Sequence, residues 1–205
     1  MIKRNIRPTC SFLILSAICS VAGFAGQDIS VQEREHAIRY LASTRDGVIE
    51  AVKGLSDAQW KFKPAPDRWS IAEITEHLAL IEGLVTNILQ KLPQAPPGAP
   101  DRDTKQADEM ILARVPDRST KVQAPPDAVP IGRWTPGEAL DHFLANRAEV
   151  TNLLRSSSDL RGHVINNPVL GPLDGYEWIL TVAAHSARHT KQILEVKADP
   201  RYPRN

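Results

Sequence analysis

The segment His185-Ser186-Ala187-Arg188-His189, near the C-terminus, places two histidines four residues apart. Residues with this spacing lie on one face of an α-helix, about one turn apart. Apolar residues recur around the pair at spacings of three and four, which predicts a helix from about Leu173 to Val196 with one core-facing stripe. That stripe contains Trp178, Val182, His185, His189, Ile193 and Val196. The two histidines are therefore expected to face the interior of the protein.

Two buried imidazoles need polar partners, because burying an unpaired polar group is costly. A divalent metal ion is one such partner, and histidines at positions i and i+4 of a helix commonly bind one. A hydrogen-bonded polar core is the alternative. The segment also differs from the His-Glu-x-x-His motif of metalloproteases, since Ser186 stands where the general base would be. A metalloprotease mechanism therefore lacks its base in this sequence.

A second helix is predicted to begin sharply after Ser70. Ser70 and Glu73 have the spacing of a capping box, and Trp69 and Ile74 occupy the positions of a hydrophobic staple. The apolar stripe that follows includes His77 on its inner face. A single histidine in such a stripe is more often a packed core residue than a ligand. The interpretation of His77 as a ligand therefore depends on the pair at 185 and 189.

Two more helices complete the pattern. One is predicted from residue 31 to about residue 55, and the other begins at Pro136 behind the capping residue Thr135. The start of this last helix repeats the start at Ser70 with an offset of 65 residues, so that His142 matches His77. An ancient duplication and the independent use of a good helix start both explain the repetition. We favour the second, because the similarity fades beyond His142.

Four helices without an alternating strand pattern predict an all-α fold, an antiparallel four-helix bundle. Long connections follow the second and third helices, over residues 93–130 and 156–174, and they allow helix orders other than simple up-and-down. The first connection holds eight of the sixteen prolines and one short predicted helix near residues 104–113. We expect it to cover the bundle rather than to form a free linker. Residues 60–66, with two prolines, are expected to be extended.

Residues 1–25 have the pattern of a secretory signal peptide, with a basic start, an apolar run and small residues at the cleavage site. The run is shorter than the roughly 20 residues that a membrane span needs. Removal of residues 1–25 takes away both cysteines and three basic residues, which leaves 22 basic and 24 acidic residues and a net charge of −2. The mature domain, residues 26–205, is thus expected in the periplasm or outside the cell. It can hold a metal only through nitrogen and oxygen, and it has no basic field for nucleic acid.

The sequence resembles the DinB-like superfamily in two motifs. The first is Trp69-Ser70-x-x-Glu73-x-x-x-His77-Leu78, and the second is His185-x-x-Arg188-His189-x-x-Gln192-Ile193. The similarity extends over about residues 31–197. The resemblance implies a four-helix bundle, often dimeric, with a divalent metal, often zinc or nickel, on His77, His185 and His189. The signal peptide distinguishes this chain from the cytosolic thiol transferases of the family, whose thiol cosubstrates are intracellular.

Three neutral imidazoles leave coordination positions open for water or a substrate, which is typical of catalytic zinc. Glu73, one turn before His77, is a candidate catalytic or hydrogen-bonding carboxylate, although the capping box already uses its side chain. His142 is a candidate fourth ligand or pocket residue. Arg188 is expected to form a structural ion pair, with an anionic substrate as the alternative partner.

Two hypotheses about function follow. The first is an exported metal-dependent hydrolase or group transferase that acts on a small molecule. The second is a non-catalytic bundle that binds a metal or a ligand. The mature protein is expected to form no stable membrane span and to be a homodimer.

Overall fold

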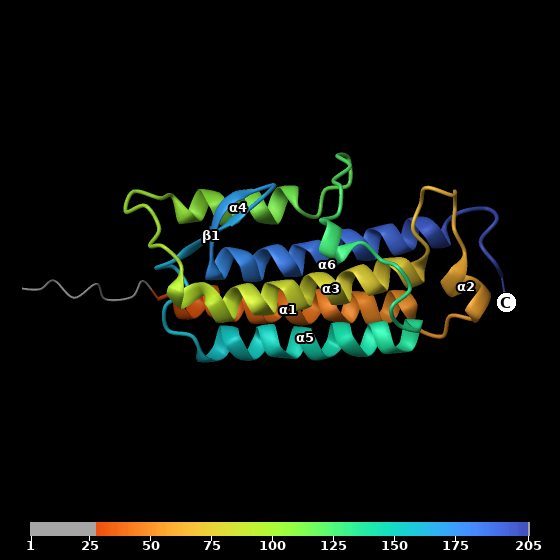
Figure 1. Cartoon of the computed structure of the whole chain (residues 1–205), viewed down its shortest axis with the longest axis horizontal. Helices are drawn as coiled ribbons and strands as arrows, with labels where there is room; N and C mark the ends of the chain where they lie inside the picture. The colour runs from red at the N-terminus through yellow and green to blue at the C-terminus, as the bar shows by residue number, and fades with distance from the viewer. Residues whose placement is uncertain (1–27, 205) are drawn as a thin grey trace, which may run out of the picture.

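The computed structural model describes residues 28–204 and contains four long helices (Figure 1). These are α1 (Val31–Val52), α3 (Ile71–Lys91), α5 (Pro136–Ser156) and α6 (Gly175–Lys197). Each begins with a complete capping box, in which the capping side chain and the third helical residue exchange hydrogen bonds with the backbone. The predicted four-helix bundle is confirmed, and α3 and α5 begin where the capping residues Ser70 and Thr135 indicated.

The helices follow an up-down-down-up order. In Figure 1, α1 and α6 both begin at the left, whereas α3 and α5 both begin at the right. The helices α1 and α6 therefore run parallel: Tyr176 donates to the carbonyl of Glu33 near both starts, and Lys197 donates to that of Ala51 near both ends. The expected antiparallel packing is found between α3 and α6 and between α1 and α5. The long connections thus produce an order other than simple up-and-down.

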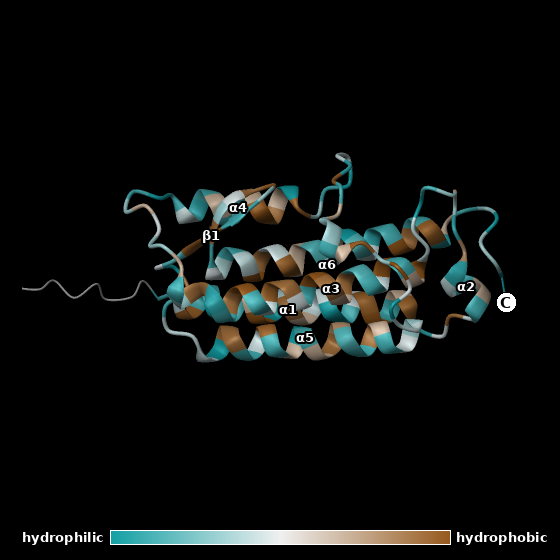
Figure 2. Cartoon of the chain, viewed as in Figure 1, coloured by the Kyte–Doolittle hydropathy of each residue, from teal (hydrophilic) through white to brown (hydrophobic). Residues whose placement is uncertain are grey.

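The bundle interior has two apolar clusters with a buried polar network between them. One cluster lies at the end where α1 and α6 begin, and the other where they finish. Figure 2 shows hydrophobic and hydrophilic residues alternating along each long helix, as expected for one buried face. Between the clusters, Arg147 forms an ion pair with Glu82 and donates to Ser186, Thr44 and the carbonyl of Leu41. Ser186 therefore faces this network.

The segment expected to be an extended connector contains a short helix, α2 (Asp57–Lys61). Ser56 begins this helix, since the backbone N–H of Ser56 donates to Gln59 over 2.9 Å. The prediction that residue 60 is extended was therefore wrong. The prolines at 64 and 66 act only on the residues just before them.

The long connection between α3 and α5 contains three short elements. They are η1 (Leu92–Gln94), α4 (Thr104–Arg114) and η2 (Pro126–Ala128). The predicted short helix over residues 104–113 agrees with α4 to one residue. Figure 1 shows α4 lying alongside α6, which agrees with the expectation that this connection covers the bundle.

The connection between α5 and α6 contains an antiparallel β-hairpin, which the sequence did not predict. Strand β1 (Val164–Asn167) pairs with β2 (Gly171–Asp174), with Val164 opposite Asp174. Gly171 has a positive φ of 83°, a conformation that favours glycine. Neither four-residue strand, Val-Ile-Asn-Asn or Gly-Pro-Leu-Asp, alternates apolar and polar residues, so the sequence carries no strand signal there.

No helix within residues 28–204 is both long and apolar enough to cross a lipid bilayer. The predicted signal peptide, residues 1–25, lies outside the described residues.

Candidate metal centre

The three predicted histidines meet in the middle of the bundle. His77 comes from α3, and His185 and His189 come from successive turns of α6. The Nε2 atom of His185 lies 3.2 Å from Nε2 of His77 and 3.1 Å from Nε2 of His189. One nitrogen from each ring lies within 4.8 Å of the others. Zinc–nitrogen bonds of about 2.0–2.1 Å at tetrahedral angles place ligand nitrogens roughly 3.3 Å apart, so Nε2 of His185 lies at the spacing of a shared cation from both other Nε2 atoms.

The outer nitrogens of two histidines fix how their rings are protonated. Nδ1 of His77 lies 2.7 Å from the carbonyl oxygen of Ala128, and Nδ1 of His189 lies 2.8 Å from Oε1 of Gln192. Both oxygens can only accept, so each Nδ1 carries the proton and each Nε2 presents a lone pair to the centre. The structure thus holds both rings in the form that binds a metal.

The environment also keeps the imidazoles neutral. Burial lowers the pKa of His77 below its ordinary value. The pKa values of His185 and His189 fall well below the ordinary value, first because of burial and second because a neighbouring imidazole opposes a further positive charge. Neutral imidazole is the form that coordinates a cation, so the cluster does not have to lose protons near neutral pH.

The ring of Trp69 packs directly on the cluster. Its centroid lies 4.8 Å from that of His77 and 6.3 Å from that of His189. The sequence indicated Trp69 only as a packing residue at the start of a helix. Its contact with two imidazoles places an apolar indole surface against the cluster.

Glu76 is a residue of the site that the sequence analysis missed. Its buried carboxylate accepts hydrogen bonds from the backbone N–H groups of Ile131, Gly132 and Arg133 at 2.8–3.3 Å, and from the Arg133 side chain at 2.8 Å. Burial by itself would raise the pKa of Glu76, but these donors outweigh it and the net pKa is lowered. Glu76 thereby fastens to α3 the segment that carries Ala128, the hydrogen-bond acceptor for His77.

The carboxylate of Glu73 is engaged away from the imidazoles. It accepts from the backbone N–H of Ser70 over 2.7 Å and from Lys63 over 2.9 Å. Burial would raise its pKa, but the bonds from Ser70 and Lys63 lower it overall. Within the described residues, the candidate metal cluster consists of the three histidines, and Glu73 is not part of it.

Two other candidates lie apart from the cluster. His142 is exposed on α5, where its ring packs on Trp134 with centroids 4.2 Å apart. Arg188 points outward from α6 and donates to the backbone carbonyls of Asp117 and Thr120. The prediction of an ion pair for Arg188 was therefore wrong, because its partners among the described residues are two backbone carbonyl groups.

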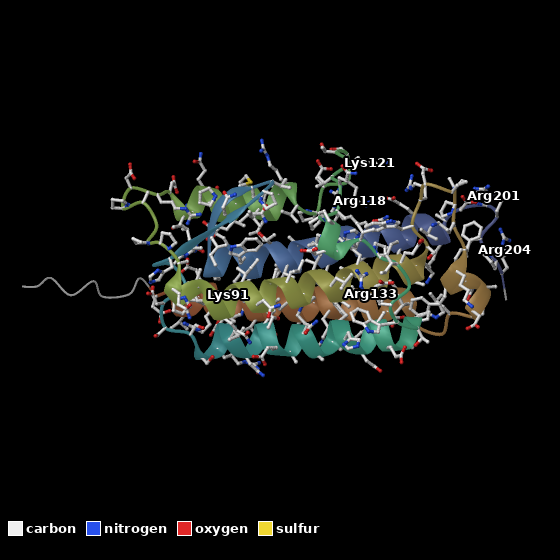
Figure 3. The ribbon with its side chains drawn as sticks, in the orientation of Figure 1. Lys91, Arg118, Lys121, Arg133, Arg201 and Arg204 are labelled. Carbon is white, nitrogen blue, oxygen red and sulfur yellow. The ribbon has the colours of Figure 1, made fainter. Side chains whose placement is uncertain are left out.

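The segment between α4 and α5 covers the cluster and is tied down at both ends. Arg118 pairs with Glu195 on α6 over 2.6 Å and donates to Gln192 over 3.2 Å. Arg133 is held by Glu76 on α3. In Figure 3, Arg118 lies by α6 and Arg133 by α3, and η2 lies between them in the chain. The expected covering segment thus contributes to the surroundings of two histidines.

Comparison with known proteins finds relatives in sequence and in fold. Uncharacterized protein YuaE from Bacillus subtilis (strain 168) is 29% identical over 149 residues, which cover 71% of this chain and 88% of YuaE. The crystal structure of TT2238, a four-helix bundle protein, has a TM-score of 0.52 at 16% identity and covers 79% of this chain and 98% of TT2238.

YfiT from Bacillus subtilis, described as a probable metal-dependent hydrolase with an unusual four-helix bundle topology, has a TM-score of 0.53 at 16% identity. The match covers 83% of this chain and 89% of YfiT. At these identities the two structures establish the fold alone. Residues 40–193, three quarters of the chain, match the sequence profile of the DinB superfamily. The chain therefore belongs to the DinB superfamily.

Proposed function

We propose that this protein binds a divalent metal ion, zinc or nickel, through His77, His185 and His189. The observation that carries the proposal is the convergence of three Nε2 atoms from two helices, two of them with outer nitrogens paired to acceptors. A hydrogen-bonded polar core would give the same rings donor and acceptor partners among themselves. Here Nε2 of His77 and Nε2 of His189 each direct a lone pair toward Nε2 of His185. A cation satisfies these lone pairs better than the single proton that His185 can offer.

We further propose that the bound metal serves hydrolysis or group transfer on a small molecule. YfiT, which has a similar fold, is described as a probable metal-dependent hydrolase, and this supports the proposal. A divalent ion on three imidazoles retains positions for water or substrate and lowers the pKa of bound water to about 7. The protein would hold the imidazoles neutral, exclude bulk water with Trp69 and fix the ring orientations through Ala128 and Gln192.

Metal analysis of the purified protein, followed by His185→Ala, tests the proposal. We expect about one divalent ion per chain in the native protein, and loss of that ion from a variant that still folds as judged by circular dichroism. If the variant unfolds, the metal is structural and the non-catalytic bundle is the better description. If the native protein loaded with zinc or nickel retains no ion after dialysis, the proposal is overturned.

Export and self-association belong to the same proposal. The signal-peptide pattern of residues 1–25 supports a periplasmic or secreted location, and the resemblance of the motifs to a family that is often dimeric supports a homodimer. Cell fractionation with a mass measurement of the mature N-terminus tests the location. Light scattering of the purified protein tests the dimer.

A further inference from the structure

His185 differs from the other two histidines in its outer nitrogen. Within residues 28–204, Nδ1 of His185 is buried and has no hydrogen-bond partner, whereas Nδ1 of His77 and Nδ1 of His189 each have an acceptor. An imidazole that offers Nε2 to a metal carries its proton on Nδ1, and a buried N–H needs an acceptor. Some group close to His185 should therefore complete its surroundings.

Thr181 lies one turn before His185 on α6, and its hydroxyl is also buried without a partner among the described residues. Other threonines in the long helices donate their hydroxyl to the carbonyl four residues earlier, as helical threonines commonly do. They are Thr44, Thr75, Thr86, Thr151 and Thr190. Thr181 does not make this bond, so its hydroxyl remains available to a side chain.

We propose that Thr181 is the positioning residue for His185, and that its hydroxyl oxygen accepts the Nδ1–H of His185 through one bound water or after rotation of either side chain. Long side chains on a helix lean toward its N-terminus and lie over the turn before their own, which is the turn of Thr181. A water between these two groups would have two polar partners, the minimum that an internal water usually has. The inference rests on the proposed metal-binding function.

The set of outer partners is then complete, with one oxygen acceptor for each imidazole. Ala128 serves His77, Gln192 serves His189, and Thr181 serves His185. Such partners fix the ring orientation and raise the basicity of the coordinating nitrogen, and their loss typically weakens metal binding about 10–100-fold.

Zinc affinity tests this inference, measured on the purified full chain by competition with a chromophoric chelator. Thr181→Val keeps the branched shape but removes the hydroxyl, and should weaken zinc binding about 10–100-fold. Thr181→Ser retains the hydroxyl and should bind zinc nearly as the native protein does. Thr86→Val is the matched control, because it removes a buried hydroxyl whose hydrogen-bond partner among residues 28–204 is the carbonyl of Glu82 on α3.

A spectroscopic measurement separates positioning from general destabilisation. In the zinc-loaded, 15N-labelled protein, the Nδ1 proton of His185 should exchange slowly with water, and Thr181→Val should accelerate that exchange without changing the Nδ1 proton of His189. Zinc affinity and exchange in Thr181→Val that match the native protein would overturn this inference alone. A native protein that binds no zinc or nickel would overturn the proposed function and this inference together.

Discussion

Oε1 of Gln192 lies 2.8 Å from Nδ1 of His189 and also accepts a hydrogen bond from Arg118 over 3.2 Å. An amide oxygen cannot donate, so this contact assigns the proton of His189 to Nδ1 and leaves the lone pair of Nε2 available to a metal. Arg118 is in turn paired with Glu195. The covering segment and one proposed metal ligand therefore meet at a single side chain on α6.

Gln192→Leu should weaken zinc binding about 10–100-fold, because Nδ1 of His189 loses its acceptor while the size of the side chain is kept. Gln192→Glu should retain tight binding, since a carboxylate accepts the same hydrogen bond. Chelator competition measures both affinities. Gln106→Leu, at an exposed position of α4, is the control and should bind as the native protein does. Native affinity in Gln192→Leu would show that this hydrogen bond does not support the site.

The stability of the metal-free protein should fall as the pH is lowered through about 6.5, the pKa of histidine in an unfolded chain. Burial lowers the pKa of His77 and holds those of His185 and His189 well below that value. The unfolded chain therefore binds more protons below this pH than the folded protein does. The stability that the neutral imidazoles confer is fully present above it and is lost on acidification, by at most about 1.4 kcal/mol per pH unit for each histidine.

Urea unfolding after chelator treatment, at several values between about pH 7.5 and 5.5, measures this dependence. Replacing the three histidines together by glutamine should flatten the profile over that range. A native profile as flat as that of the triple variant would contradict the assignment of neutral buried imidazoles.

The fold was largely predictable because the capping residues that begin its helices can be recognised in the sequence. Ser70 and Thr135 begin α3 and α5 where the capping boxes indicated. Ser56 also begins a helix, α2, within a segment that its two prolines predicted to be extended. The relative direction of the helices was not predictable, because a long connection can return the chain to either end of the bundle.

The positions of the histidines were predictable from periodicity, whereas the groups around them were not. Ala128 contributes a backbone carbonyl, which carries no sequence signal. In the sequence, Glu76 resembles the other glutamates of the helices. The features that single it out are its burial beside His77 and the positive φ of Gly132, and both come from the structure. Gln192 belongs to the motif that begins at His185, but the sequence assigned it no role. Contacts between distant segments depend on packing that a single sequence does not display.

Arg147→Met should destabilise the protein by about 3–5 kcal/mol, because it leaves the carboxylate of Glu82 buried and unpaired. Both side chains are almost fully buried, and burial raises the pKa of Glu82 while Arg147 opposes that rise. The double variant with Glu82→Leu should recover much of the loss, since no buried charge remains. Urea unfolding gives the free energies.

The exposed pair Arg39 and Glu35 offers the control for this measurement. Arg39→Met should change the free energy of unfolding by less than about 1 kcal/mol, as expected for a solvated ion pair. A double variant at 147 and 82 that is as unstable as the sum of its single variants would show that the two charges do not depend on each other.

Glu76→Gln should loosen the covering segment and weaken zinc binding together. The amide keeps one oxygen acceptor, but its NH2 group cannot accept from the backbone N–H groups of residues 131–133, and the charge that pairs with Arg133 is lost. His77 then loses the fixed position of its Ala128 acceptor, so zinc affinity should fall about tenfold or more. Limited proteolysis should cut residues 115–133 faster. Glu109→Gln, at an exposed position of α4, should change neither property. If Glu76→Gln accelerates proteolysis and leaves zinc affinity unchanged, the covering segment is not needed to hold the ring of His77.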